Sequence, residues 1–132
     1  MSKSLMQTVN TSSQTVAVNG IISPGTVTRR FGCNIRLDGN AQQLNGEGYY
    51  ARTGAVTVQP TAAGIVSVAL YEDGVQIPGA ISSETAAAGD TITLPLEATT
   101  RLSCCKTNAQ ITCVLISGAG TVTNYTMRVE KV

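Results

Sequence analysis

The chain contains no histidine, and this absence removes much of the catalytic chemistry that a domain of its size could carry. Histidine is the usual general base near neutral pH and the commonest metal ligand. Without it, neither a serine–histidine–acid triad nor a cysteine–histidine pair can be built. No catalytic, cofactor-binding or metal-binding motif stands in its place. We therefore expect a protein that is not an enzyme and that uses no cofactor or metal.

Charge is also scarce, at 13% of the residues, and nine Lys and Arg nearly balance eight Asp and Glu. A surplus of positive charge is what binds phosphate backbones, so we expect no nucleic-acid partner. No apolar run reaches the length of about 18 residues that a membrane helix needs, so we expect no membrane span. The first residues lack the apolar segment of a secretion signal, which predicts synthesis and folding in a bacterial cytoplasm.

Aromatic residues are few, with no Trp and one Phe, so the apolar content is mainly aliphatic and is accompanied by many Thr. β-Branched side chains favour strands. Thirteen Gly and four Pro provide turn residues between short alternating segments. The Asp73-Gly74 pair between two apolar runs predicts a tight β-hairpin. These patterns predict an all-β protein, built as a sandwich or barrel.

The length of 132 residues suits one domain. Residues 1–13 are polar and show no periodicity, which predicts a flexible tail. Residues 14–132 carry the strand and turn patterns, which predicts a single domain over that range.

Four cysteines are present, at positions 33, 104, 105 and 113. The adjacent pair Cys104-Cys105 does not fit the ligand spacing of a zinc site. A reducing compartment favours free thiols, and Cys113 lies inside an apolar run that predicts burial. We expect four free and largely buried thiols, with a disulfide through Cys33 as the alternative.

The strongest predicted strand, Gly64–Glu72, is apolar on both faces between Ile65 and Tyr71. One face is wholly aliphatic, and the other is broken only by Ser67. A sandwich buries one face of each strand, so the second face needs a cover. Another copy of the chain is the expected cover, and a long loop is the alternative. The candidate core or subunit-interface residues are Ile65, Val66, Val68, Leu70, Tyr71, Leu115 and Tyr125.

One segment is informative through the order of its residues as well as their composition. Gly54–Val68 reads as glycine, an alternating strand, proline, alanine-glycine and then a long strand, and it resembles the core signature of the C1q/TNF-like jelly rolls. The hairpin Leu70–Gly79, the strand entry Ala88–Leu94 and the ending Gly120–Val132 resemble later parts of that family. The similarity covers roughly residues 48–132. The chain departs from the family at Val66, where many members have an aromatic residue, and in lacking a collagen-like stalk.

The resemblance implies an antiparallel jelly-roll sandwich that forms a homotrimer. Without a stalk, the chain is similar to small phage and prophage proteins that serve as head fibres or capsid decorations. This implies a location on the virion, with residues 1–13 as an arm that reaches capsid proteins. The alternative is a cell-surface or spore-surface binding module with the same trimeric fold. Such a module recognises a glycan or protein on a host. Tyr49 and Tyr50 could stack on a sugar, but we expect instead that one ring is buried and the other lies at the rim.

Overall fold

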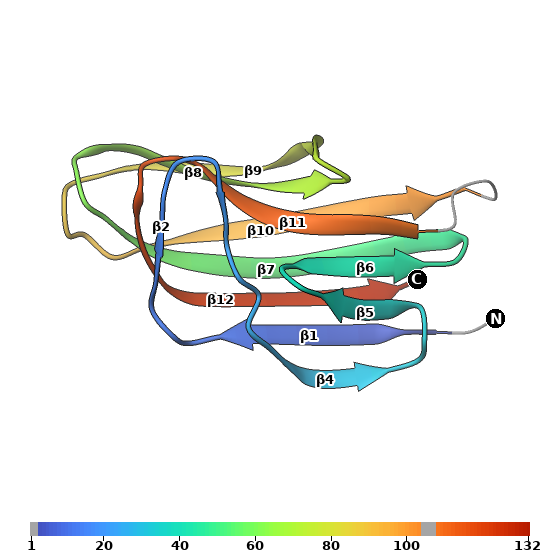
Figure 1. Cartoon of the computed structure of the whole chain (residues 1–132). Helices are drawn as coiled ribbons and strands as arrows, with labels where there is room; N and C mark the ends of the chain where they lie inside the picture. The colour runs from blue at the N-terminus through green and yellow to red at the C-terminus, as the bar shows by residue number, and fades with distance from the viewer. Residues whose placement is uncertain (1–2, 104–107) are drawn as a thin grey trace.

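The computed structural model describes residues 3–103 and 108–132, and in that part every regular element is a β-strand (Figure 1). The strands are β1 (Leu5–Asn10), β2 (Gln14–Val16), β3 (Gly20–Ile21), β4 (Thr26–Phe31), β5 (Ile35–Asp38), β6 (Ala41–Asn45), β7 (Gly48–Pro60), β8 (Gly64–Glu72), β9 (Val75–Ala86), β10 (Ile92–Leu102), β11 (Asn108–Ser117) and β12 (Gly120–Lys131). The described part contains no helix of membrane-spanning length and apolarity.

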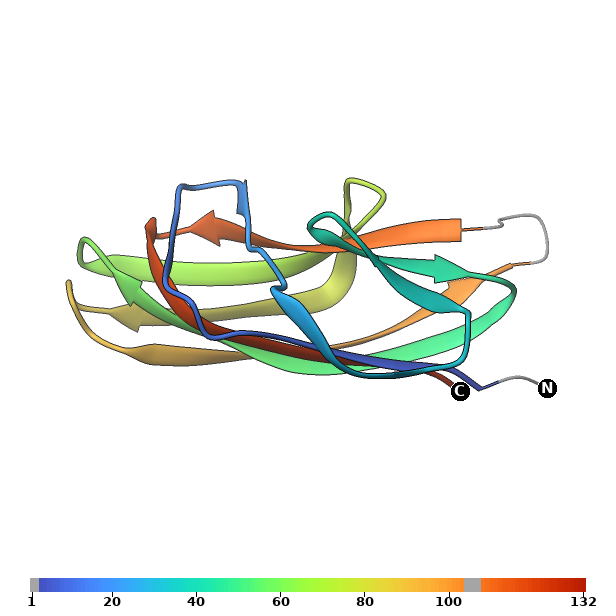
Figure 2. The same cartoon turned by 60° about the horizontal axis from the view of Figure 1, so that its bottom comes forward.

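The strands form two antiparallel sheets that lie over one another (Figure 2). Sheet A has the order β10-β7-β12-β1-β4, with the short β2 also beside β12. Sheet B has the order β5-β6-β11-β8-β9, with the short β3 also beside β11. Several strands that are adjacent in a sheet are distant in sequence. For example, β1 pairs with β12 along its whole length. The predicted all-β antiparallel sandwich is therefore confirmed.

The hairpin between β8 and β9 has the predicted tight turn. Asp73 and Gly74 both have positive φ angles, of 50° and 86°. A type I′ turn requires positive φ at both central residues, and it matches the twist of the flanking strands. Glu72 therefore lies opposite Val75 in the ladder, as a two-residue loop demands.

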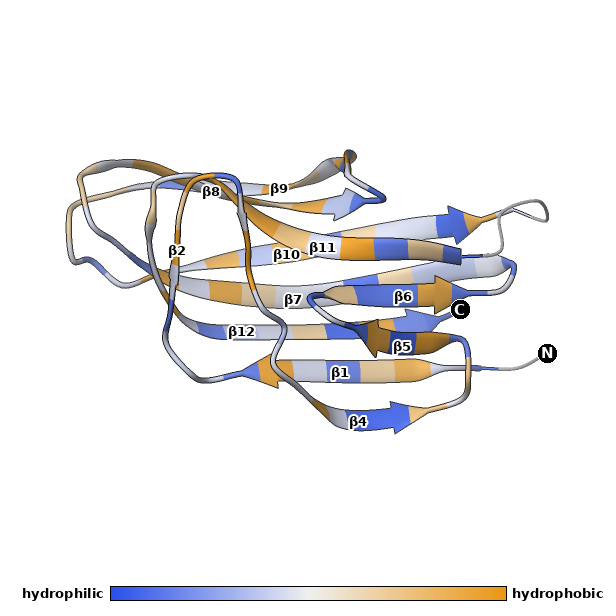
Figure 3. Ribbon diagram, viewed as in Figure 1, coloured by the Kyte–Doolittle hydropathy of each residue, from blue (hydrophilic) through white to orange (hydrophobic). Residues whose placement is uncertain are grey.

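The core fills the space between the sheets with inward-facing residues of the long strands. Figure 3 shows hydrophobic and hydrophilic residues alternating along most of these strands, as a half-buried sheet requires. The buried side chains are mainly Val, Leu, Ile and Met, with Tyr50 and Tyr125 as the large aromatic members. A core poor in aromatic residues is therefore built from many mid-sized aliphatic side chains.

The prediction of a flexible tail over residues 1–13 is wrong for β1. This strand lies between β12 and β4, and Met6 and Thr8 are fully buried. Only one of its inward residues is apolar, because Thr8 is the other, so the sequence shows no clear alternation. Its polar inward residue is satisfied by a hydrogen bond from Gln42 on the facing sheet. The folded domain therefore begins at β1, and the predicted start at residue 14 comes too late.

Candidate functional site: the faces of the two sheets

The structure separates the seven predicted core or interface residues into two groups. Val66, Val68 and Leu70 point inward from β8 and are almost completely buried. Leu115 on β11 and Tyr125 on β12 are buried in the same cluster. These five residues hold the two sheets together. The remaining two, Ile65 and Tyr71, lie on the outward face of sheet B.

The outward face of sheet B carries an apolar row. Ile21 lies opposite Val114, Val114 opposite Ala69, and Ala69 opposite Ile81, so the row crosses four neighbouring strands. Ile21 and Ile81 at its ends are nearly half exposed, and Ile65 beside it is 58% exposed. Ala69 and Val114 in its middle are buried, at 0% and 8% exposure, so the described segments leave only the ends of this row open to another copy.

The outward face of sheet A differs in its chemistry, because it carries hydroxyl side chains on β7 and β10 and the exposed charges of Arg128 and Glu130 on β12. The hydroxyl groups of Thr57 on β7 and Thr93 on β10 are hydrogen-bonded at 3.2 Å, and Gln59 donates to Thr91 at 3.0 Å. Small, uncharged side chains allow another surface to approach closely. The chain thus offers two extended surfaces for association, one hydroxyl-rich and one with an apolar row.

A polar layer crosses the core between these faces. Arg52 on β7 is only 2% exposed, and its Nη1 donates to Oε1 of Gln42 on β6 at 2.9 Å. Gln42 in turn donates from Nε2 to the hydroxyl of Thr8 on β1 at 3.1 Å. The layer therefore links β7 of sheet A to β6 of sheet B, and β6 in turn to β1 of sheet A. Nε and Nη2 of Arg52 are buried without a hydrogen-bond partner, which makes this charge expensive to keep.

Burial governs the ionisation of this layer and its neighbours. Loss of hydration lowers the pKa of Arg52 to about 10, while the nearby Tyr125 and Glu72 act in the opposite direction. Burial also raises the pKa of the Cys113 thiol to about 12 and the pKa of Tyr125 well above its usual value. At neutral pH the arginine is therefore charged, and the thiol and phenol are neutral, so Cys113 is not an activated nucleophile.

Replacing Gln42 by Leu is expected to lower the free energy of unfolding by about 1–3 kcal/mol, because it removes the acceptor of a buried charged donor. Adding Arg52→Met to that variant should recover most of the loss, since an apolar side chain of similar volume needs no partner. Urea unfolding of the wild type, both single variants and the double variant measures these differences. A double variant less stable than Gln42→Leu alone would show that Arg52 stabilises the core by itself.

The sequence patterns do not single out Arg52, although the alternation along β7 places it on the inward face. Tyr50, Val56 and Val58 share its face of β7, and all three are fully buried. Tyr50 donates from its hydroxyl to the carbonyl oxygens of Asn45 and Gly46, so it is not available to stack on a sugar. Tyr49 faces outward and lies 5.6 Å from the guanidinium carbon of Arg101.

The described cysteines divide between core and surface. Cys113 is a free, buried thiol as predicted. The predicted burial is wrong for Cys33, which is free and exposed because it lies in the bend between β4 and β5, outside any strand. Cys104 and Cys105 lie outside the described residues. Among the residues that the structure does describe, no three His, Cys, Asp or Glu side chains come together as metal ligands.

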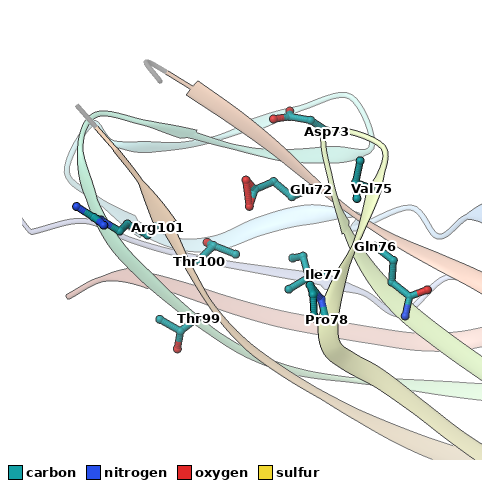
Figure 4. Close-up of a pocket in the computed structure, with 9 residues that line it drawn as sticks. All are labelled: Glu72, Asp73, Val75, Gln76, Ile77, Pro78, Thr99, Thr100 and Arg101. Atoms are coloured by element: carbon teal, nitrogen blue, oxygen red, sulfur yellow. The ribbon is translucent and has the colours of Figure 1, made fainter. Parts of the chain in front are cut away.

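A cleft of about 460 Å³ opens between β10 and the β8–β9 hairpin. The hairpin strand β9 carries Pro78 and then Gly79, whose φ is 82°. In Figure 4 Glu72 extends from β8 toward β10, and Ile77 and Pro78 form an apolar wall, while Arg101 points away. The cleft therefore combines a carboxylate, hydroxyl groups and apolar carbon atoms at the edge of the sandwich.

Comparison with solved structures identifies the architecture. The chain superposes on murine APRIL at pH 5.0 with a TM-score of 0.76 and 10% identity, covering 99% of this chain and 100% of that one. The globular domain of zebrafish complement 1qA matches with a TM-score of 0.72 and 8% identity, covering 97% and 95%. The fold is a C1q/TNF-like jelly roll. The similarity includes β1, so the jelly roll begins before residue 14, where the sequence predicted its start.

A third match to the jelly roll is the vertex protein P5 of PRD1, with a TM-score of 0.59 and 12% identity. It covers 97% of this chain and 72% of that one. No family model matches the sequence, and no curated protein matches it. At these identities the three structures share the fold with this chain, and its surfaces have to be interpreted from its own residues.

Proposed function

We propose that this chain is a virion structural protein, a homotrimeric head fibre or capsid decoration of a phage or prophage. The observation that carries the proposal is the shared fold with the vertex protein P5 of PRD1 over 97% of this chain. The residues support it, because a histidine-free sandwich with low charge and large outward faces suits assembly better than catalysis.

Self-association is the first part of this proposal. The resemblance to the C1q/TNF-like jelly rolls implies a homotrimer, and each sheet presents an outward face that another copy can cover. The apolar row on sheet B is open at Ile21 and Ile81, and the hydroxyl-rich face of sheet A includes Thr57 and Thr93. Obligate interfaces commonly bury roughly 2,000–5,000 Å² in total, which requires an extended face on each subunit.

Attachment to the particle is the second part. Because residues 5–10 belong to sheet A, they are not available as a free arm. We therefore infer that the surface of the folded domain contacts the capsid proteins.

A binding module on a cell or spore surface is the second candidate. The cleft between β10 and the β8–β9 hairpin favours it, since a carboxylate beside apolar carbon atoms can bind a small part of a host glycan or protein. The two candidates share the trimer and differ in where the protein resides.

Particle purification tests the proposal. Particles from a strain that expresses the chain are separated on a density gradient, and the chain is detected with an antibody. We expect it in the particle fraction in constant proportion to the major capsid protein. Recovery in the cell-envelope fraction alone would refute the virion role and support the surface-binding alternative.

A further inference from the structure

The strand β4 forms an open edge of sheet A. It is hydrogen-bonded to β1 and to no other strand in the described part of the chain, and Figure 1 shows it at the margin of the sandwich. All six of its residues are exposed. An edge strand presents unpaired N–H and C=O groups, which is a template on which another strand can pair.

The other three sheet edges carry features that hinder such pairing. Proline cannot donate to a ladder, and Pro95 lies within β10 while Pro78 and Gly79 interrupt β9. The remaining edge, β5, has only four residues. β4 contains neither proline nor glycine, and its one irregularity is a register shift in its pairing with β1 between Gln7 and Thr8. It is therefore the edge of the sandwich best suited to accept an added strand.

The charge around β4 has one sign. The first 37 residues contain four Lys and Arg and no Asp or Glu. Arg29 lies opposite Gln7 and Arg30 opposite Met6, so the two arginines project from opposite faces of β4. Both are exposed, and within residues 3–103 and 108–132 the one hydrogen bond of the Arg29 side chain goes to the neighbouring carbonyl oxygen of Thr28. An added strand would therefore meet a positive side chain on each face.

Apolar side chains flank these arginines. Val27 and Phe31 are both exposed, and Phe31, the one Phe of the chain, is 56% exposed. They lie near the two ends of β4, on either side of the arginine pair. A partner segment that complements β4 would be extended, with two adjacent acidic residues in its middle and β-branched residues around them. Cross-strand pairs of opposite charge and of apolar residues stabilise a sheet, so such a segment would pair favourably.

We propose that the free edge of β4 binds an extended acidic segment of a partner protein by strand addition. Pairing with β4 of a second copy would collect four arginines on one short ribbon, and their repulsion disfavours it. The proposal goes beyond the virion role and holds wherever the trimer resides. On a particle, strand addition at β4 would provide the contact with capsid proteins that the sequence had assigned to an arm of residues 1–13.

A synthetic peptide tests the proposal with the full chain. The probe is a fluorescent Thr-Val-Thr-Glu-Glu-Val-Thr-Val, and its control has Lys-Lys in place of Glu-Glu. We expect the acidic peptide to bind at low salt, as measured by fluorescence anisotropy, and the basic peptide not to bind. Amide hydrogen exchange in residues 26–31 should slow on binding, because strand addition protects backbone N–H groups while a purely ionic contact does not.

Charge-reversal variants locate the site. The double variant Arg29→Glu, Arg30→Glu should weaken binding by about tenfold or more. Arg101→Glu changes an exposed arginine on β10, the opposite edge of sheet A, and should leave affinity within about twofold. Equal binding of the two peptides, absence of protection at residues 26–31, or a preference for duplex DNA would each overturn the proposal. The exchange measurement uses the wild type, so it decides the question even if the double variant fails to fold.

Discussion

Replacing Leu70 by Asp is expected to abolish the soluble, folded protein. Leu70 is 1% exposed and lies in the core between the sheets, opposite Cys113 in the ladder. An unpaired carboxylate at such a site costs several kcal/mol, and the total stability of a domain is only about 5–15 kcal/mol. Soluble yield and circular dichroism of the purified protein measure the loss.

Gln76→Asp is the matched control for Leu70→Asp. Gln76 lies on β9, the neighbouring strand, and is exposed, so the same new charge should change the free energy of unfolding by no more than about 0.5 kcal/mol. Yield and circular dichroism should equal those of the wild type. If both variants are obtained in equal yield and with equal stability, the assignment of the inward face of β8 is wrong.

Deletion of residues 1–13 should also prevent folding. The deletion removes β1, and β4 then loses the strand to which it is hydrogen-bonded. It also removes the buried Met6, and large-to-small changes at such sites alone cost about 2–5 kcal/mol. The loss of Thr8 leaves the amide of Gln42 without its buried acceptor. Together with the lost strand pairing, these losses are comparable to the total stability of a domain, about 5–15 kcal/mol.

A shorter deletion, of residues 1–3, is the control for this experiment because it leaves Ser4 and β1 in place. Thermal unfolding should show a cooperative transition at the wild-type temperature for the short deletion and none for the long one. A cooperative transition and normal yield for the protein lacking residues 1–13 would mean that β1 is dispensable and that the domain starts later.

The sequence was sufficient to predict those strands that are long and have apolar inward residues. The alternation of Val66, Val68 and Leu70 identified a strand with two apolar faces, and the Asp73-Gly74 pair identified the hairpin. Alternation alone does not distinguish the inward face from the outward one, because both faces of this strand are apolar. That choice depends on where sheet A lies, which is a property of the whole fold.

The failures have physical causes of their own. β1 alternates Met6 with the polar Thr8, so its burial depends on Gln42, a partner on the facing sheet that local patterns do not reveal. Arg52 follows the inward alternation of β7, but a charged residue in a core is rare enough that composition argues against it. Cys33 is surrounded by short strands, and its bend places it at the surface.

Static light scattering of the purified wild-type protein, at concentrations on the order of micromolar, tests the central claim most directly. We propose that this jelly roll forms a homotrimer in which neighbouring copies cover the outward sheet faces. The expected mass is three times 13.7 kDa. A stable, folded monomer of 13.7 kDa would contradict it, because the partly exposed apolar row on sheet B would then have no copy to cover it.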